Sequence, residues 1–261
     1  MTMLARACML AALVVIQGCA HQGAEMPATQ RNTSIGPVLG ADNSSSEGTY
    51  SWKGVPYAKP PVGALRWKAP VDADRWSTVR RTTEFGSACV QTGRMYGPGL
   101  NNRYDVSVGA TLGKTLGSED CLYLNIWQPS SPAKAARPVI VWVYGGSNIT
   151  GYTGDPVYDG STLAKTADAV VVSVNYRLGI FGFLNLAQLK TGDVNDDSGN
   201  FALLDIAKAL EFVQNNIANF GGNPNQVTLM GQSAGAVNIL GLLTSPRSQA
   251  DRPSCFIGSS R

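Results

Sequence analysis

The chain has 261 residues, of which 44% are hydrophobic and 15% charged, a balance typical of a globular protein with a sizeable core. This composition excludes a disordered chain. The net charge of +3 is too small to indicate nucleic-acid binding, and no basic stripe or aromatic-interleaved patch occurs. The sequence therefore predicts no nucleic-acid partner.

The N-terminus has the features of a targeting segment. Arg6 supplies the positive start, residues 7–16 form a short apolar run, and small residues follow. This run is too short to span a bilayer, which takes about 20 apolar residues. We expect a signal peptide over residues 1–20, a flexible leader over residues 21–33, and export to the bacterial periplasm, to the outer membrane or out of the cell.

Residues 16–19, Ile-Gln-Gly-Cys, also resemble a bacterial lipobox, which would place a lipidated Cys19 at the mature N-terminus. Gln17 fits that pattern poorly. The alternative is ordinary cleavage near Ala20 and release as a soluble protein. Membrane attachment through Cys19 therefore stays open.

The next segments read as strands and loops. Residues 36–76 read as short strands broken by Gly and Pro, and residues 90–118 as a long Gly-rich loop. Apolar runs predict further strands over residues 122–127, 139–144, 169–174 and 227–230. The run at 169–174 is apolar almost throughout, which is typical of a strand buried on both faces.

Residues 203–220 form the clearest predicted helix. One face collects apolar residues at 3.6-residue spacing: Leu203, Ile206, Ala207, Leu210, Val213, Ile217 and Phe220. The turn sequence of residues 221–224, Gly-Gly-Asn-Pro, ends it. Strands alternating with helices favour a parallel α/β sheet.

Residues 231–235, Gly-Gln-Ser-Ala-Gly, lie between an apolar strand and a second apolar segment. A strand, G-x-S-x-G and a helix in this order are typical of a nucleophile elbow, which exposes the serine hydroxyl at the top of a sheet. We therefore predict that Ser233 is the nucleophile of an acyl transfer. The alternative interpretation is an ordinary turn serine.

Four further blocks occur in a consistent order before the elbow. They cover residues 54–58 (GVPYA) with 60–63 (PPVG), 119–125 (EDCLYLN), 174–179 (VNYRLG) and 219–224 (NFGGNP), followed by the elbow. With these blocks the chain resembles the N-terminal half of the type-B carboxylesterase and cholinesterase family of α/β-hydrolases. The resemblance implies a partial α/β-hydrolase domain over residues 34–246, with a mostly parallel sheet, N-terminal antiparallel strands and truncation after the elbow.

The resemblance also implies roles for site residues. Ser233 would attack an ester carbonyl, and backbone N–H groups of Ala234, Gly146 and Ser147 would stabilise the oxyanion. Residues 144–147, Tyr-Gly-Gly-Ser, depart from the three glycines of the family, although Ser147 still offers its N–H. The alternative for Gly146 and Ser147 is an ordinary β-turn.

Three structural pairings are implied as well. They are a disulfide Cys89–Cys121 and ion pairs Arg66–Glu119 and Arg177–Asp205. In cholinesterases the disulfide loop carries a tryptophan that stacks on choline, whereas this loop contains Tyr96 and Tyr104 but no tryptophan. Gln232 also replaces the acidic residue usual before the nucleophile. Both departures favour a general carboxylesterase that acts on a small-molecule carboxylic ester, and the sequence indicates no cofactor and no metal site.

The family triad also needs an acid and a histidine downstream of the serine. The only histidine, His21, lies in or beside the signal. We therefore expect an incomplete chain with a divergent tail over residues 247–261, an exposed edge on the strand of the elbow, and little activity alone, because losing such a histidine costs roughly 10⁶-fold in turnover. The alternatives are a non-catalytic cholinesterase-like binding protein and an inactive frameshift fragment.

Overall fold

The computed structural model describes residues 27–245 except residue 96, together with the backbone strand at residues 255–259. The predicted signal, Cys19 and His21 lie outside the described residues. Within that part of the chain, no helix has the length and apolar character needed to cross a membrane.

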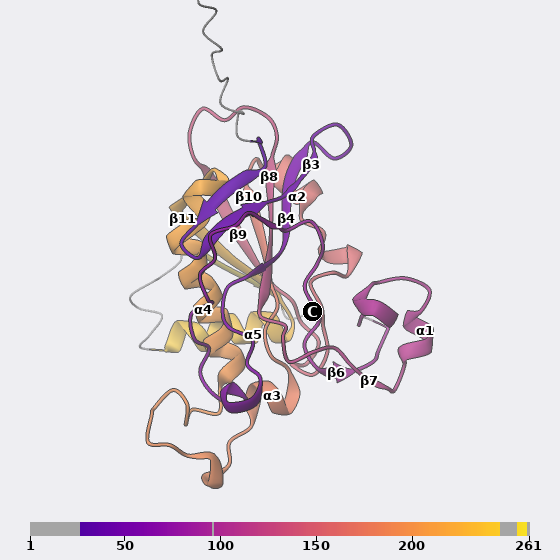
Figure 1. Ribbon diagram of the computed structural model, residues 1–261, viewed down its shortest axis with the longest axis vertical. Helices are drawn as coiled ribbons and strands as arrows, with labels where there is room; N and C mark the ends of the chain where they lie inside the picture. The colour runs from indigo at the N-terminus through magenta and orange to yellow at the C-terminus, as the bar shows by residue number, and fades with distance from the viewer. Residues whose placement is uncertain (1–26, 96, 246–254, 260–261) are drawn as a thin grey trace, which may run out of the picture.

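A seven-stranded mixed sheet forms the centre of the molecule, in the order β12-β11-β9-β10-β8-β4-β3 (Figure 1). Its strands are β3 (Ala41–Asn43), β4 (Thr49–Pro56), β8 (Tyr123–Pro129), β9 (Arg137–Val143), β10 (Val170–Val174), β11 (Gly222–Gln232) and β12 (Cys255–Ser259). From β12 to β10 neighbouring strands are parallel, and from β10 to β3 they are antiparallel. The predicted partial α/β-hydrolase fold with N-terminal antiparallel strands is confirmed.

Strand β10 shows why its sequence is apolar throughout. Val170, Val172 and Val174 pack into the main core cluster on one face of the sheet. Val171 points to the other face, where it packs with Trp127 and Ala164. All residues of the strand are buried, so the sheet has a core on both sides.

Helices α4 (Phe201–Asn216) and α5 (Ala234–Thr244) pack on the first of these faces, and α2 (Ser161–Ala167) packs on the second. The predicted helix is confirmed, although it starts two residues earlier and becomes the 3₁₀-helix η5 (Ile217–Phe220) at its end. Four residues of its predicted apolar face are buried, whereas Leu203, Ala207 and Leu210 are only half-buried at the margin of the core. Gly221 ends the helix in the left-handed region, with φ 76°.

The N-terminal strands β1 (Gln30–Thr33), β2 (Gly36–Leu39) and β5 (Arg80–Arg81) form a separate three-stranded sheet. β1 lies within residues 21–33, where we predicted a flexible leader. It is anchored because it pairs with β2 and because the Trp52 indole N–H donates to the carbonyl of Thr29 at 2.7 Å. Regular structure therefore starts before the predicted domain boundary.

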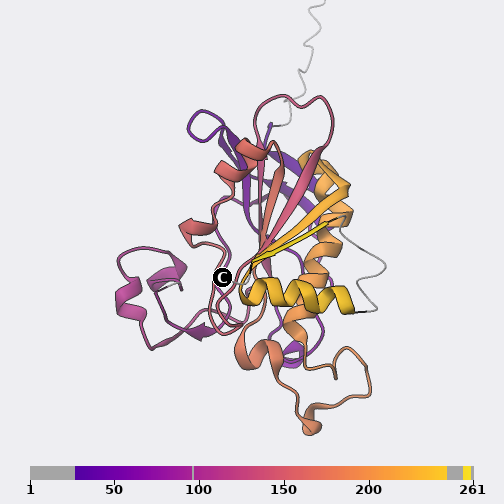
Figure 2. The ribbon, with the colours of Figure 1, turned by 180° about the vertical axis from the view of Figure 1, so that it is seen from behind.

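A further segment, residues 91–118, stands to one side of the sheet, away from α4 and α5 in both views (Figures 1 and 2). It contains β6 (Gln91–Thr92), η2 (Leu100–Asn102), α1 (Val108–Thr111) and β7 (Thr115–Leu116), with β6 paired to β7. We call it the disulfide segment. The other short helices are η1 (Gly63–Leu65), η3 (Pro156–Tyr158), α3 (Gly179–Phe183) and η4 (Ala187–Leu189).

Strand β12 corrects two expectations. We expected a divergent tail over residues 247–261 and an exposed edge on the elbow strand, yet β12 pairs in parallel with β11 over five residue pairs from Thr228 to Gln232. The elbow strand is therefore not at the edge of the sheet, because β9 and β12 flank it. The local sequence gave no signal for this strand because its pairing is entirely non-local.

Candidate active site

The site lies where three parallel strands end. The register places Gly231 of β11 beside Val143 of β9, and Val143 beside Val174 of β10. The three chain segments that leave these strands therefore start at the same edge of the sheet. In α/β sheets, ligands bind outside the carboxyl ends of the strands, so this edge is the candidate site.

Ser233 forms a sharp turn between β11 and α5. Its backbone has φ 53° and ψ −123°, a strained conformation for a residue with a side chain, and the residue is half-buried. A Cβ on Gly231 would lie 2.8 Å from the carbonyl carbon of Gly235, and a Cβ on Gly235 would overlap the carbonyl oxygen of Val143. Both flanking positions therefore require glycine because backbone passes too close for a side chain.

The loop after β9, residues 144–151, lies directly against this turn. A Cβ on Gly145 would lie 2.9 Å from the Cβ of Ser233 and 2.5 Å from the carbonyl oxygen of Gln232. Gly146 follows with φ 116°, and Ser147 is exposed with φ 56°. We call residues 144–151 the glycine loop.

Backbone N–H groups near the turn remain available as donors. The carbonyl of Gly146 accepts from the N–H groups of Ile149 and Thr150 at 3.1 and 3.2 Å. The N–H groups of Gly146, Ser147 and Ala234 have no acceptor among the described residues. For Ala234 this is expected, because the first N–H groups of a helix have no intrahelical partner.

Two asparagines join the glycine loop to helix α5. The side-chain amide of Asn238 donates to Asn148 Oδ1 at 2.8 Å, and that of Asn148 donates to Asn238 Oδ1 at 3.1 Å. We call these residues the asparagine pair. The backbone carbonyl of Asn148 also accepts from the N–H of Gly179 at 2.6 Å.

Gln91 of the disulfide segment holds the far end of the glycine loop. Its Oε1 accepts from the Thr150 hydroxyl at 2.8 Å and from the Gly151 N–H at 2.9 Å. Its Nε2 donates to the carbonyls of Gly151 and Cys89 at 2.9 and 3.0 Å. The loop is therefore bound on one side to the nucleophile helix and on the other to the disulfide segment.

Buried tyrosines support the same loop. The Tyr176 hydroxyl donates to the carbonyl of Tyr144 at 2.7 Å, and the two rings stack with centroids 4.6 Å apart. Burial raises the pKa of both hydroxyl groups far above the usual range. Both hydroxyls therefore stay neutral and act as hydrogen-bond donors.

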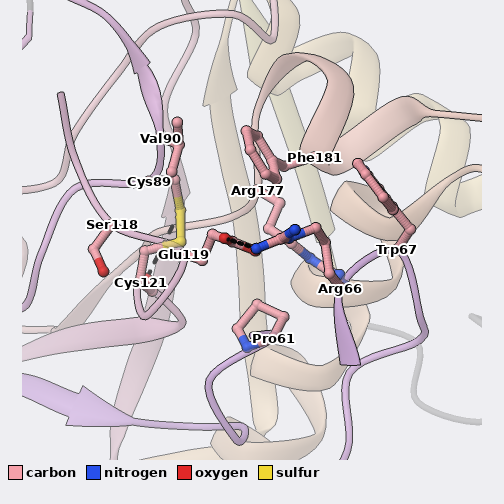
Figure 3. A pocket seen from close by; sticks show the side chains of 10 residues that line it. All are labelled: Pro61, Arg66, Trp67, Cys89, Val90, Ser118, Glu119, Cys121, Arg177 and Phe181. Carbon is pink, nitrogen blue, oxygen red and sulfur yellow. Dashed lines mark hydrogen bonds and ion pairs between the residues drawn. A yellow bond between two sulfur atoms is a disulfide. The ribbon is translucent and has the colours of Figure 1, made fainter. Parts of the chain in front are cut away.

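The three implied pairings are present. Cys89 and Cys121 form a disulfide. The Arg66 guanidinium donates twice to Glu119 at 2.5 Å, and that of Arg177 donates to Asp205 at 2.7 and 2.8 Å. Figure 3 shows the disulfide, the Arg66–Glu119 pair and Arg177 around one small cavity.

The two ion pairs differ in burial. Arg177 and Asp205 are almost entirely buried, whereas 40% of the Arg66 side chain is exposed. Burial acts against the charge of Arg177, but the carboxylate of Asp205 outweighs it and raises the pKa of the guanidinium. The inner pair is therefore a fixed part of the core below the site.

No contact in the described structure joins Tyr104, one of the two tyrosines of the disulfide loop, to the turn at Ser233. Tyr104 is exposed and donates to the carbonyl of Met95 at 3.3 Å, and it lines a separate cleft with Arg103 and Tyr152. Tyr96 lies outside the described residues.

Within the described chain, no group of three His, Cys, Asp or Glu side chains is placed to hold a metal ion.

Sequence reasoning missed the asparagine pair and Gln91. Asn148 and Asn238 are 90 residues apart, and Gln91 and Thr150 are 59 apart. No spacing rule connects positions so distant in the chain. Only the register of β9 beside β11 brings the asparagines together.

Comparison with known proteins agrees with this geometry. The model of the carboxylesterase family matches residues 27–256. The chain is 42% identical over 214 residues to a para-nitrobenzyl esterase of Bacillus subtilis (strain 168), covering 82% of this chain and 40% of the relative. It is 42% identical over 224 residues to a fumonisin B1 esterase of Sphingopyxis macrogoltabida, covering 86% and 38%. It is 40% identical over 218 residues to a cholinesterase of Mus musculus, covering 83% and 34%.

Solved structures give the same result. A thermophilic pNB esterase matches with a TM-score of 0.74 and 38% identity, over 87% of this chain and 43% of that one. A carboxylesterase of Geobacillus stearothermophilus matches with a TM-score of 0.72 and 38% identity over the same shares. The chain thus spans less than half the length of the relatives that it matches. The strand order, the glycine-flanked turn at Ser233 and these matches together show that the chain belongs to the carboxylesterase family, within the α/β-hydrolase superfamily.

Proposed function

We propose that this chain carries the nucleophile and the oxyanion donors of a serine carboxylesterase. The observation that supports this most strongly is the strained turn at Ser233, which lies against the glycine loop at the carboxyl ends of the parallel strands. A strained residue with a side chain persists only where its surroundings fix it, and such positions cluster at active sites.

In this proposal Ser233 Oγ attacks the carbonyl carbon of an ester while a base removes its proton. The carbonyl oxygen becomes an oxyanion, which accepts hydrogen bonds from the N–H groups of Gly146, Ser147 and Ala234. Collapse of the intermediate expels the alcohol and leaves an acyl group on Ser233. Water, activated by the same base, then releases the acid.

The base is not among the residues of this sequence that follow Ser233, because no histidine occurs there. The relatives are more than twice as long as the part that matches. We therefore assign the acid and the histidine of the triad to a segment outside this sequence, and expect the chain alone to be inactive or nearly so. The rate loss without a triad histidine is roughly 10⁶-fold.

The substrate class in this proposal is a small carboxylic ester. The matched relatives include esterases named for para-nitrobenzyl and fumonisin B1 esters. The residue before the nucleophile, Gln232, is neutral, which gives no carboxylate there to attract a cationic alcohol.

A fluorophosphonate probe tests the proposal, because it labels only an activated serine. We would compare this chain with a chimera that joins residues 27–245 to the corresponding C-terminal part of the Bacillus subtilis relative, and with the Ser233→Ala form of the chimera. Intact-mass spectrometry should show labelling of the chimera alone, with hydrolysis of para-nitrophenyl acetate. A chimera that unfolds cooperatively yet takes no label at Ser233 would contradict the esterase and favour a non-catalytic binding protein.

Export and lipidation form a separate proposal that depends on residues 1–20 alone. We expect secretion in a bacterial host, followed by labelling of Cys19 with radioactive palmitate if the lipobox is used. The matched control is Cys19→Ser, which should abolish labelling and leave cleavage near Ala20. A precursor that stays uncleaved in the cytoplasm would contradict export.

A further inference from the structure

We infer that the asparagine pair, Asn148 and Asn238, is a positioning device that fixes the donors of the glycine loop relative to the nucleophile helix. This inference rests on the proposed function for its catalytic consequence. Its structural part stands on the contacts of the two side chains alone.

The first observation is that the glycine loop needs external support. Ser147 and Asn148 both adopt the left-handed region, with φ 56° and 58°. Each such residue with a side chain costs free energy relative to a right-handed conformation, although asparagine tolerates it better than most. Two consecutive residues of this kind are stable only when neighbouring groups hold them in place.

The second observation is that the pair supplies this support at the right place. Asn148 directly follows Ser147, and Asn238 lies on α5, the helix that starts immediately after Ser233. The two amides exchange hydrogen bonds in both directions, at 2.8 and 3.1 Å. A reciprocal pair fixes the orientation of both amide planes as well as their separation, so the loop and the helix are held in one relative position.

The third observation is that Asn238 has no evident local role. Asparagine is a poor helix former, and this one is in the interior of α5 rather than at its cap. It is 3% exposed, so its amide would be costly to bury without partners. Its amide exchanges hydrogen bonds with Asn148 in both directions, and the Tyr176 hydroxyl, which supports the same loop, also contacts both asparagines. The contact with the glycine loop and its supporting tyrosine therefore accounts for the burial of Asn238.

The catalytic consequence follows from geometry. An oxyanion donor helps only if it is fixed where the charge develops, and losing one donor typically costs roughly 10²–10³-fold in rate. Releasing the loop from α5 would misplace two of the three proposed donors without removing either. The loss should therefore appear in kcat while KM changes little, as for an interaction made only in the transition state.

The first experiment uses this chain as it is. Asn238→Ala should increase the hydrogen-exchange rate of the Ile149, Thr150 and Gly179 amides about 10-fold or more, because their acceptors belong to the glycine loop. Asn148→Gly should do the same while relieving the backbone, and the double variant should add nothing to either single variant. If Asn238→Ala does not fold, Asn238→Ser serves instead.

The matched control is Asn216→Ala. Asn216 is another buried asparagine on a neighbouring helix, and its amide binds Ser34 and the carbonyl of Phe212, far from the loop in the chain. It should lower overall stability yet leave the three reporter amides within about 2-fold of wild type under native conditions. Equal acceleration in Asn216→Ala, or none in Asn238→Ala, would overturn the inference.

The second experiment measures catalysis in the chimera described above. Asn238→Ala should lower kcat about 10-fold or more with KM nearly unchanged, and Asn216→Ala should leave kcat unchanged. If exchange accelerates but kcat does not fall, the pair is structural and the positioning role is wrong. If the chimera with Asn238 intact is itself inactive, the proposed esterase function fails, and the exchange experiment still decides whether the pair holds the loop.

Discussion

The turn at Ser233 and the disulfide segment are both irregular pieces of chain, but their conformations are set differently. At the turn, the surroundings leave no room: a Cβ at Gly145, Gly231 or Gly235 would meet backbone atoms of neighbouring strands or of the helix. In the disulfide segment, Gly109 and Gly113 have open space around them, and the atoms that a Cβ on Gly93 or Gly117 would meet belong to the segment itself or to the neighbouring residues Ala88 and Cys89. The first region is therefore shaped by packing against the rest of the fold, and the second mainly by bonds within itself.

Attachment to the body differs in the same way. The turn joins a central strand and a helix whose apolar residues belong to the main core cluster. The disulfide segment is attached through the Cys89–Cys121 bond, through Gln91, and through the Asn102 side chain, which binds Gly86 and Ala88. Damage below the turn should therefore weaken the whole fold, whereas damage in the segment should remain more local.

The largest effect should come from the buried ion pair below the site. Asp205→Ala leaves the Arg177 guanidinium buried without its carboxylate, and such a loss costs about 3–5 kcal/mol of unfolding free energy. Urea denaturation measures it. The control is Glu119→Ala, which removes the partner of the partly exposed Arg66 near the disulfide and should cost clearly less. Equal losses at both sites would remove the distinction between the two regions.

Removal of the disulfide should come next. The variant Cys89→Ala/Cys121→Ala frees a loop with a sequence separation of 32, which costs about 3–4 kcal/mol on the chain-entropy model. Hydrogen exchange should accelerate first in residues 91–118 and less in β11, because the core strands open only with global unfolding. Uniform acceleration across both regions would show that the segment is an integral part of the core.

A smaller effect is expected from adding one methyl group in each region. Gly235→Ala forces a Cβ against the carbonyl oxygens of Val143 and Tyr144 and should destabilise by about 1–3 kcal/mol. Gly109→Ala lies in helix α1 with nothing within 4 Å, and should be neutral or stabilise by up to about 1 kcal/mol. Thermal unfolding should therefore give a lower Tm for Gly235→Ala and an unchanged or higher Tm for Gly109→Ala. Equal decreases in Tm would contradict the difference in packing.

The smallest effect concerns pH. Burial raises the pKa of Asp155, which caps η3 by accepting from the Val157 N–H at 3.0 Å. As pH rises, this carboxyl group ionises at a lower pH in the unfolded chain than in the folded protein. The stability that it contributes below its ordinary pKa is therefore lost as pH rises through the raised pKa of the folded state. Asp155→Asn keeps the acceptor and removes the charge. Its stability relative to wild type should therefore be greater at pH 7 than at pH 3 in urea titrations, and a difference independent of pH would be the contrary result.

Local signals in the sequence predicted much of this structure. The apolar run at residues 169–174, the helix before Gly221 and the glycine-flanked Ser233 are set by period, burial and turn chemistry, which neighbouring residues display. The family resemblance added the disulfide and both ion pairs, which no spacing rule would have paired. These parts are confirmed as secondary structure and contacts.

Elements that depend on distant partners could not be predicted. β12 is short and becomes a strand because β11, which is distant in the sequence, offers unpaired backbone groups. β1 pairs with the adjacent β2 instead, and its polar sequence, Gln-Arg-Asn-Thr, hid it from prediction. The asparagine pair is invisible in sequence because its members belong to different strand–loop units. Tertiary contacts decide such cases, and a single sequence without homologues does not show them.

The contact at Gly145 also limits how this site can change by mutation. The glycine loop is packed directly against Ser233, because a Cβ added at Gly145 would lie 2.9 Å from the Cβ of Ser233. An alanine at position 145 would push the nucleophile itself, so its effect depends on what occupies positions 232 and 233. Evolutionary paths that enlarge residue 145 must therefore pass through a compensating change in the turn, and the order in which the substitutions arise decides whether each intermediate keeps its hydroxyl in place.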